Sequence, residues 1–165
     1  ILDNVNLSTQ TITREIRFGT EFYATTTLQL QDDPAPTFRR NCTYALNANT
    51  PCTILMFKPS DAVDARDRIA FYLLSGVLYK TTYPFGGSSS TEQMTSNDVT
   101  ISSLFFYVEG AQTSDGSNDE SDATDFKQPL ITFLLSGSTN SASGRVASTT
   151  FNFETNISPR ELDSI

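Results

Sequence analysis

The sequence predicts an α+β fold in which one N-terminal amphipathic helix packs on an antiparallel β-sheet, with or without a small second sheet. Two observations carry this prediction. Apolar residues recur at helical spacing only within the first 18 residues, and the later segments alternate apolar and polar residues over short runs bounded by Gly, Pro and Ser. A helix followed by a run of strands is typical of α+β domains, and 165 residues suit a single domain over 1–165.

The helix is predicted over residues 1–18. Its apolar face consists of Leu2, Val5, Thr9, Ile12 and Ile16, which follow one another at intervals of three and four residues. Arg14 and Arg17 in the last turn match the negative end of the helix dipole, and Gly19 is expected to end the helix in the left-handed conformation. No capping residue precedes the first apolar position, which suggests that the helix continues upstream of Ile1. A frayed first turn explains the same observation.

Strands are predicted from residue 24 onward. The expected segments are Thr26–Gln31, Cys52–Lys58, Arg68–Leu74, Val77–Tyr83, Val99–Glu109, Leu130–Ser136 and Ser148–Ile157. Ser75 and Gly76 are expected to form a tight hairpin turn, because glycine adopts a positive φ without strain. The apolar register shifts at Ser102 and Ser103, which indicates a β-bulge.

Three segments interrupt the predicted strands. Residues 32–40 form a Pro-stiffened connector, residues 85–98 are rich in Gly and Ser and read as a mobile surface loop, and residues 109–129 hold the densest group of acids. The two cysteines, Cys42 and Cys52, lie in a turn-like segment after the connector. A local disulfide in an oxidising compartment is expected, with two reduced thiols as the alternative.

Charge and composition exclude several functional classes. The formal net charge is −8, and no cluster of Lys and Arg is present, so nucleic acid is not expected as a partner. The chain contains no histidine, which excludes catalytic triads, His-ligated zinc and a His general base. A pair of carboxylates acting on a glycoside is disfavoured, because the acids lie on a loop without aromatic neighbours. The sequence therefore predicts a protein that is not an enzyme and needs no cofactor.

One acidic segment is a candidate calcium site. Its oxygen-bearing residues are Asp115, Asn118, Asp119, Glu120, Asp122 and Asp125. The order of ligands does not match an EF-hand, because no Gly follows the third ligand and no Glu closes the loop at the twelfth position. A structural calcium ion and a solvated, self-repelling acidic loop both remain open as interpretations.

Four stretches together resemble a known family. They are TREIRFG at residues 13–19, IAFYLLSGVLYKTT at residues 69–82, NDVTISSLFFYVEG at residues 97–110 and FNFETNISPRELDSI at residues 151–165. In this order they are similar to the type IV pilin-like proteins, and within them to the minor pilin and pseudopilin branch of the PulJ, GspJ or PilW type. Each stretch is a pattern of apolar and turn residues rather than a chemical signature.

The resemblance implies a bacterial, non-enzymatic structural subunit of a type IV pilus, a type II secretion system or a competence pseudopilus. It implies that the predicted helix is the soluble half of a longer helix, whose apolar half anchors the precursor in the inner membrane before prepilin-type cleavage and assembly. The partners would be other pilins or pseudopilins in a cell-surface or periplasmic filament. The apolar face of the helix would contact the sheet or neighbouring subunits. The alternative is a stand-alone secreted binding or adhesion domain that recognises a ligand through its surface loops.

Overall fold

The structure is a computed structural model and describes residues 2–26, 42, 51–111, 128–139 and 148–159. Within these ranges the chain forms one helix and eight strands, arranged in two antiparallel sheets. The predicted α+β, pilin-like class is wrong, because most of the described residues belong to strands and the helix is a single short element. The alternating segments 99–109 and 130–139 form long strands with a sheet of their own instead of extending the first sheet.

The elements follow one another in a simple order. The helix is α1 (Leu2–Phe18), and the five strands of the large sheet are β1 (Thr20–Thr25), β2 (Ile54–Lys58), β3 (Arg68–Leu74), β4 (Val77–Tyr83) and β5 (Ser90–Gln93). The small sheet contains β6 (Val99–Glu109), β7 (Leu130–Thr139) and β8 (Thr150–Ile157). Within each sheet the strand order equals the chain order, so every neighbour in the sequence is also a neighbour in space.

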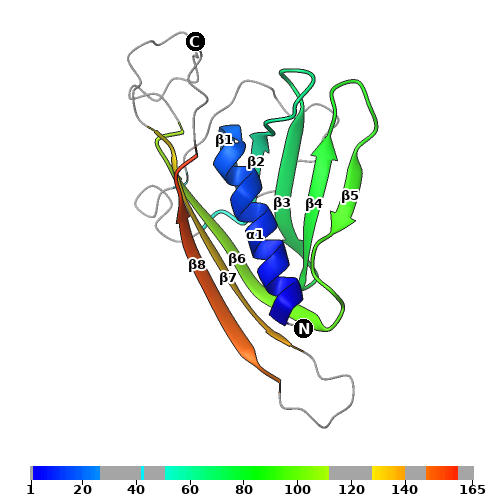
Figure 1. Cartoon of the computed structure of the whole chain (residues 1–165), viewed down its shortest axis with the longest axis vertical. Coiled ribbons are helices and arrows are strands. Elements are labelled where there is room, and N and C mark those ends of the chain that lie inside the picture. Colours follow the sequence, from blue (N-terminus) through cyan, green and yellow to red (C-terminus); the bar gives the residue numbers. More distant parts are fainter. Residues whose placement is uncertain (1, 27–41, 43–50, 112–127, 140–147, 160–165) are drawn as a thin grey trace.

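Helix α1 lies over the angle between the two sheets, with β8 on one side and β3 to β5 on the other (Figure 1). Its buried residues Val5, Ile12 and Ile16 belong to one hydrophobic core with side chains from both sheets. The sequence predicted that the helix packs on one sheet. It packs on both sheets instead. None of the described helices is long and apolar enough to cross a membrane.

Aromatic residues fill the core on both sides of the helix. In the large sheet the rings of Phe22 and Phe57 lie 5.2 Å apart, and those of Phe57 and Phe71 lie 6.0 Å apart. In the small sheet Phe133 is 5.5 Å from Phe106. Rings at these separations add attraction beyond the area they bury, so each set of rings stabilises its own sheet. The same rings belong to the hydrophobic core that α1 shares with both sheets.

Strand β6 joins the two sheets. The peptide groups of Cys42 and Val108 exchange two hydrogen bonds, and the Phe106 N–H donates to the carbonyl of Cys52. At the other end of the strand, the Ile101 N–H donates to the carbonyl of Gly76 in the β3–β4 turn. These contacts lie along the outer edge of β6, and we call this line of contacts the seam. Here Cys42, Cys52 and Gly76 take the place of a neighbouring strand.

The predicted disulfide is confirmed. Cys42 and Cys52 are bonded, both are buried, and each also pairs with β6 through its backbone. The predicted hairpin and bulge are also present. Ser75 and Gly76 both have positive φ, at 51° and 79°, and the β6–β7 register shifts between Ile101 and Ser103. Ser75 was not expected to adopt this conformation.

The prediction for Gly19 is wrong in its mechanism. The helix ends there, and the Gly19 N–H donates to the Ile16 carbonyl, but Gly19 is not among the described residues with positive φ. A Cβ atom at this position would lie 2.3 Å from the Phe57 ring. Glycine is present because the chain passes directly against a core aromatic ring, not because a left-handed turn requires it.

Several strand boundaries also differ from the prediction. Strand β1 lies at Thr20–Thr25, directly after the helix, instead of at Thr26–Gln31, of which residues 27–31 are outside the described ranges. The stretch 85–98, expected as a loop, contains strand β5, whose four residues are all exposed. Strand β7 extends to Thr139, and β8 begins at Thr150 rather than Ser148. The connector 32–40 lies outside the described residues.

Candidate interaction surface on helix α1

The two faces of helix α1 have different environments. On the inner face, Val5, Thr9, Ile12 and Ile16 are buried against the protein's own sheets, and the side chain of Leu2 is outside the described set. On the outer face, Leu7 is 63% exposed and Phe18 is 43% exposed. The predicted apolar face is thus covered within the subunit, and a different set of side chains is available to a partner.

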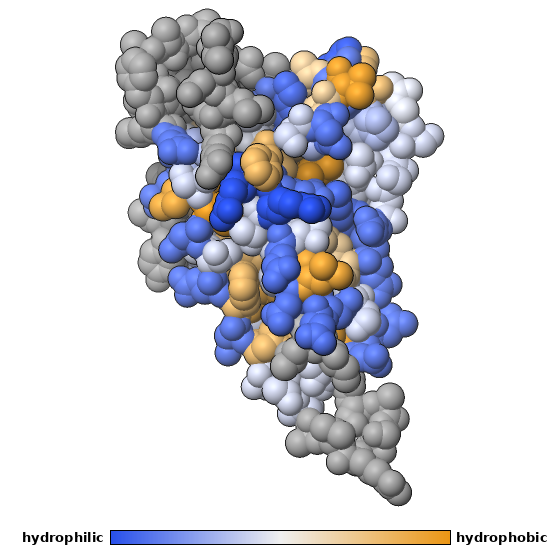
Figure 2. All heavy atoms as spheres, viewed as in Figure 1, coloured by the Kyte–Doolittle hydropathy of each residue, from blue (hydrophilic) through white to orange (hydrophobic). Residues whose placement is uncertain are grey.

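The exposed residues Leu7, Arg14 and Phe18 follow one another at intervals of seven and four, so they form a line along the helix. We call this line the outer ridge. Figure 2 shows this side of the molecule, where apolar residues are scattered among polar ones and do not merge into one continuous apolar patch. A mixed surface of this kind suits a partner that supplies both charged and apolar side chains.

Polar contacts fix the helix at both ends, so the outer ridge is held rigidly. The Ser8 hydroxyl lies 2.6 Å from the Met94 carbonyl oxygen, and the Asn4 side-chain oxygen accepts from the Ser96 N–H at 2.9 Å. Toward the other end, Lys80 Nζ lies 2.7 Å from a carboxylate oxygen of Glu15. The helix is therefore attached to the segment after β5 and to β4.

Two open grooves flank the outer ridge. The first lies between α1 and the large sheet and is lined by Arg14, Glu15, Phe18, Pro59, Ser60, Asp61, Ile69, Lys80 and Thr82. The second lies between α1 and β8 and is lined by Asn6, Thr9, Gln10, Thr13, Arg14, Arg17, Phe18, Phe153 and Thr155. Both grooves are open and share Arg14 and Phe18. A pair of shallow grooves on either side of a helix suits side chains from a protein partner better than an enclosed small molecule.

The outer face also carries cations that form no ion pair with any described residue. In the described part of the chain, Lys58, Arg66, Arg68 and Lys80 each form an ion pair. Within that same part, no ion pair involves Arg14 or Arg17, and both are exposed. In a chain with a net charge of −8, these two arginines make the end of α1 locally positive. An acidic surface is the matching chemistry.

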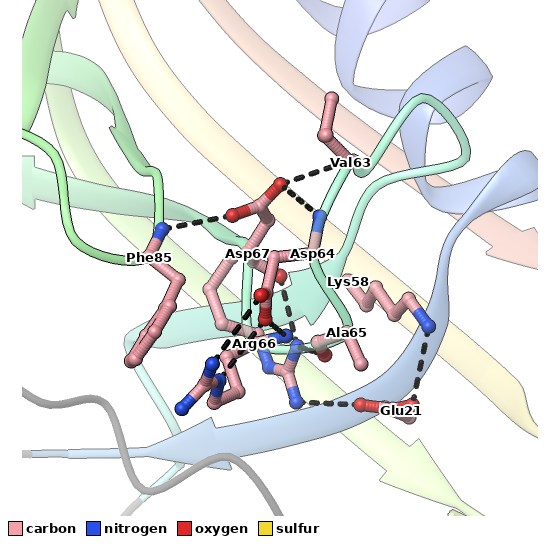
Figure 3. A network of polar contacts seen from close by, with 9 residues as sticks. Glu21, Lys58, Val63, Asp64, Ala65, Arg66, Asp67 and Phe85 are labelled. Atoms are coloured by element: carbon pink, nitrogen blue, oxygen red, sulfur yellow. Dashed lines mark hydrogen bonds and ion pairs between the residues drawn. The ribbon is translucent and has the colours of Figure 1, made fainter.

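A second polar cluster lies away from the helix, in the loop between β2 and β3 (Figure 3). The carboxylate of Asp67 accepts hydrogen bonds from the N–H groups of Val63, Asp64 and Phe85, and Asp64 binds the Arg66 side chain. The hydrogen bond from the Asp64 N–H is the largest cause that lowers the pKa of Asp67, and the bond from the Phe85 N–H is the next. The side-chain hydrogen bond from Arg66 lowers the pKa of Asp64. Both acids are ionised acceptors.

Two contacts complete this cluster. The guanidinium carbon of Arg66 lies 3.0 Å from the centre of the Phe85 ring, and Arg68 donates to the carbonyls of Ala65 and Asp67. Asp64 and Asp67 both accept hydrogen bonds from backbone N–H groups of this loop. The cluster therefore shapes the loop.

The other sequence-predicted site lies outside the described residues. The candidate calcium ligands at Asp115, Asn118, Asp119, Glu120, Asp122 and Asp125 all fall within 112–127. In the part of the chain that the structure describes, no group of three or more acidic, Cys or His residues is placed to hold a metal ion. The calcium prediction stays a prediction.

The outer ridge was missed by the sequence reasoning, although a signal was present. Leu7 and Phe18 are large apolar residues that do not belong to the predicted apolar face, and they lie 11 residues apart on one side of the helix. Apolar residues on the polar side of an amphipathic helix indicate a second contact surface.

Comparisons with protein-family models, with curated proteins and with solved structures find no match for this chain.

Proposed function

We propose that the protein is a non-enzymatic structural subunit, of the minor kind, of an extracytoplasmic filament of the type IV pilus, type II secretion or competence class. The observation that carries the proposal is the two-sided helix: the inner face of α1 is satisfied within the subunit, and the rigid outer ridge remains available. The partners are other pilins or pseudopilins, and the contact is between the outer ridge and an acidic surface of the neighbouring subunit.

Two further features support this proposal. The buried disulfide fits an oxidising, extracytoplasmic compartment. Helix α1 is attached to both sheets, so force applied along the helix is passed to the whole core rather than to one strand. The proposal requires an apolar helical segment of about 20 residues in the encoded protein just before α1, which would anchor the precursor in the inner membrane.

The decisive experiment uses the full encoded protein in cells that assemble the filament. The variant Arg14→Ser/Phe18→Ser removes one exposed cation and one exposed apolar side chain from the outer ridge. The control, Val63→Ser/Leu74→Ser, removes two exposed apolar side chains away from the outer ridge, where Val63 is 99% exposed and Leu74 is 55% exposed. Filament incorporation is measured by sedimentation of sheared fibres and immunoblotting.

We expect the ridge variant to fold normally and to be lost from the filament fraction, while the control is incorporated like the wild type. Thermal unfolding of both purified domains checks the folding, because exposed substitutions usually change stability by less than about 0.5 kcal/mol. Normal incorporation of the ridge variant, or an encoded sequence without an apolar segment before α1, would reject the proposal.

The alternative function is a secreted binding or adhesion domain. The observation that favours it is the β2–β3 loop, which projects Val63 into solvent on a framework fixed by Asp67 and by the Arg66–Phe85 contact. An ordinary cleaved signal peptide upstream, with no apolar segment continuing into α1, would support this alternative.

A further inference from the structure

Strands β1, β5, β6 and β8 lie at the edges of the two sheets. Three of these edges are protected, each in a different way, and in the described part of the chain the edge of β8 is not. The outer edge of β6 is covered by backbone hydrogen bonds that it forms with Cys42, Cys52 and Gly76. Strand β5 has only four residues, and β1 is interrupted by a bulge at Glu21, whose φ is 55°. Covering, short length and bulges are the usual devices that prevent a sheet edge from pairing with another chain.

Strand β8 has none of these devices. It runs for eight residues along the outer side of the small sheet (Figure 1), and its register with β7 is unbroken from Thr150 to Ile157. It contains no Pro and no Lys, and no described segment pairs with its second edge. A long regular edge of this kind is a template for a further strand.

The hydrogen-bonding pattern shows which residues of β8 direct their backbone N–H and C=O groups away from β7. The Thr139 N–H donates to the Thr149 carbonyl at 2.9 Å, so Thr149 directs its carbonyl toward β7. Direction alternates along an antiparallel strand, and the odd-numbered residues up to Ile157 therefore bond to β7. The outward N–H and C=O groups belong to the exposed residues Thr150, Asn152, Glu154 and Asn156.

We propose that the partner on this edge is a second copy of the chain, whose own β8 pairs antiparallel with the first and makes one continuous six-stranded sheet. The two-fold axis passes through Phe153, so that Phe153 lies opposite Phe153 of the second copy. This register places Asn152 opposite Glu154 and Thr150 opposite Asn156, and it pairs all eight outward backbone groups. The inference is independent of the proposed filament function.

The neighbouring registers that keep the same faces together are less favourable. Centring the pair on Glu154 would place two carboxylates directly opposite each other, and like charges in that position are destabilising. Centring it on Asn152 would place Asn156 opposite Ser148, which lies outside the strand. In the proposed register the Asn152 amide can donate to the Glu154 carboxylate, and the two Phe153 rings form a close pair across the axis.

Amide hydrogen exchange of the wild-type domain tests the proposal directly. We expect exchange at Asn152, Glu154 and Asn156 to slow by at least about threefold when the protein concentration is raised from the low micromolar to the millimolar range. The amides of Phe153 and Thr155, which already bond to β7, should show no change and serve as internal controls. NMR detection resolves the individual residues.

Cysteine variants test the register. The variant Phe153→Cys places two thiols on the axis, where the Cα atoms of such a non-hydrogen-bonded pair lie about 4.5 Å apart, within the range that a disulfide spans. The control Phe151→Cys has the same residue change on the same strand, but its symmetry mates lie about 13 Å apart. Mild oxidation should crosslink the first variant and not the second.

A charge exchange completes the test. Asn152→Glu sets a carboxylate against Glu154 of the second copy and should abolish the concentration-dependent protection, whereas Asn152→Glu/Glu154→Lys should restore it. Exchange that is independent of concentration, or equal crosslinking of the two cysteine variants, would overturn the proposal. Protection that appears only when a different protein is added would overturn the second copy as the occupant.

Discussion

The side chain of Arg68 on β3 extends past β2 to reach Glu21 on β1, where its guanidinium donates a 2.5 Å hydrogen bond to the carboxylate. Arg68 is only 5% exposed, and Lys58 on the intervening strand lies 3.8 Å from the same carboxylate. Glu21 is also the bulged residue with a positive φ, a conformation that costs a non-glycine residue about 1 kcal/mol or more. The ion pair thus holds a strained residue at the edge of the large sheet.

Removing Arg68 is expected to be strongly destabilising. The variant Arg68→Met keeps the volume of the side chain but leaves Glu21 as a largely buried charge without its main partner, and we expect the free energy of unfolding to fall by about 3 kcal/mol. The control Lys58→Met removes the more exposed and more distant cation, and it should cost less than about 1 kcal/mol. Urea unfolding of both variants measures the difference, and equal losses would contradict this account.

Gly19 should not tolerate even a single methyl group. In Gly19→Ala the new Cβ would overlap the Phe57 ring, and overpacking of this kind costs about 1–3 kcal/mol. Adding Phe57→Leu should reduce the penalty of the alanine, because the smaller side chain removes the clash. Gly86→Ala is the control, since Gly86 has a positive φ and no neighbour within 4 Å. Its cost should be unaffected by Phe57→Leu in a double-mutant cycle.

The β2–β3 loop should loosen in acid. Hydrogen bonds from the Asp64 and Phe85 N–H groups lower the pKa of Asp67 below its ordinary value of 3.8. The native state therefore binds fewer protons, so the stabilisation is complete above pH 3.8 and is lost as the pH falls through the lower pKa.

Amide exchange at Val63, Asp64 and Phe85 is expected to accelerate, relative to exchange in the β3 core, as the pH is lowered through this range. Asp67→Asn should show the loosened state at neutral pH, because an amide has one acceptor oxygen where the carboxylate uses two. Asp61→Asn, which changes an exposed acid of the same loop, is the control. A profile that does not depend on Asp67 would contradict the prediction.

The disulfide should contribute measurably to stability. Replacing both Cys42 and Cys52 with Ala opens a loop with a sequence separation of 10 residues, and we expect a loss of about 2–3 kcal/mol in the free energy of unfolding. A reducing agent should shift the unfolding midpoint of the wild type toward that of the double variant and leave the variant unchanged. The denatured wild-type protein should show no titratable thiol before reduction.

The sequence revealed local features better than it revealed how they combine. The full extent of β6 followed from the alternation between Val99 and Glu109, and the β3–β4 hairpin followed from Gly76. Which strands belong to which sheet did not follow, because the pairing partner of a strand is decided by contacts distant in the sequence and leaves no local period. Strand β5 was not predicted, because all of its side chains are exposed and its sequence has no apolar alternation that would indicate a buried face.

The candidate surface shows the same limit. The periodicity of α1 identified residues that are now seen to be buried within the subunit, such as Ile12 and Ile16. The periodicity did not predict the outer ridge, because an isolated apolar residue such as Leu7 or Phe18 is common on a helix surface. These residues indicate a contact surface only when the grooves beside them are known. The outer edge of β8, which no described segment covers, became visible only when the other edges were seen to be covered, short or bulged.

The seam between the sheets is held very differently at its two ends. Near Phe106 and Val108, three backbone hydrogen bonds join β6 to Cys42 and Cys52, which the disulfide links to each other. Near Ile101, one backbone hydrogen bond joins β6 to the β3–β4 turn. Thermal opening of the angle between the sheets should accordingly pivot about the cysteine end, like a hinge. The displacement would be greatest beside the first turns of α1, at the end of the molecule where β6 begins (Figure 1).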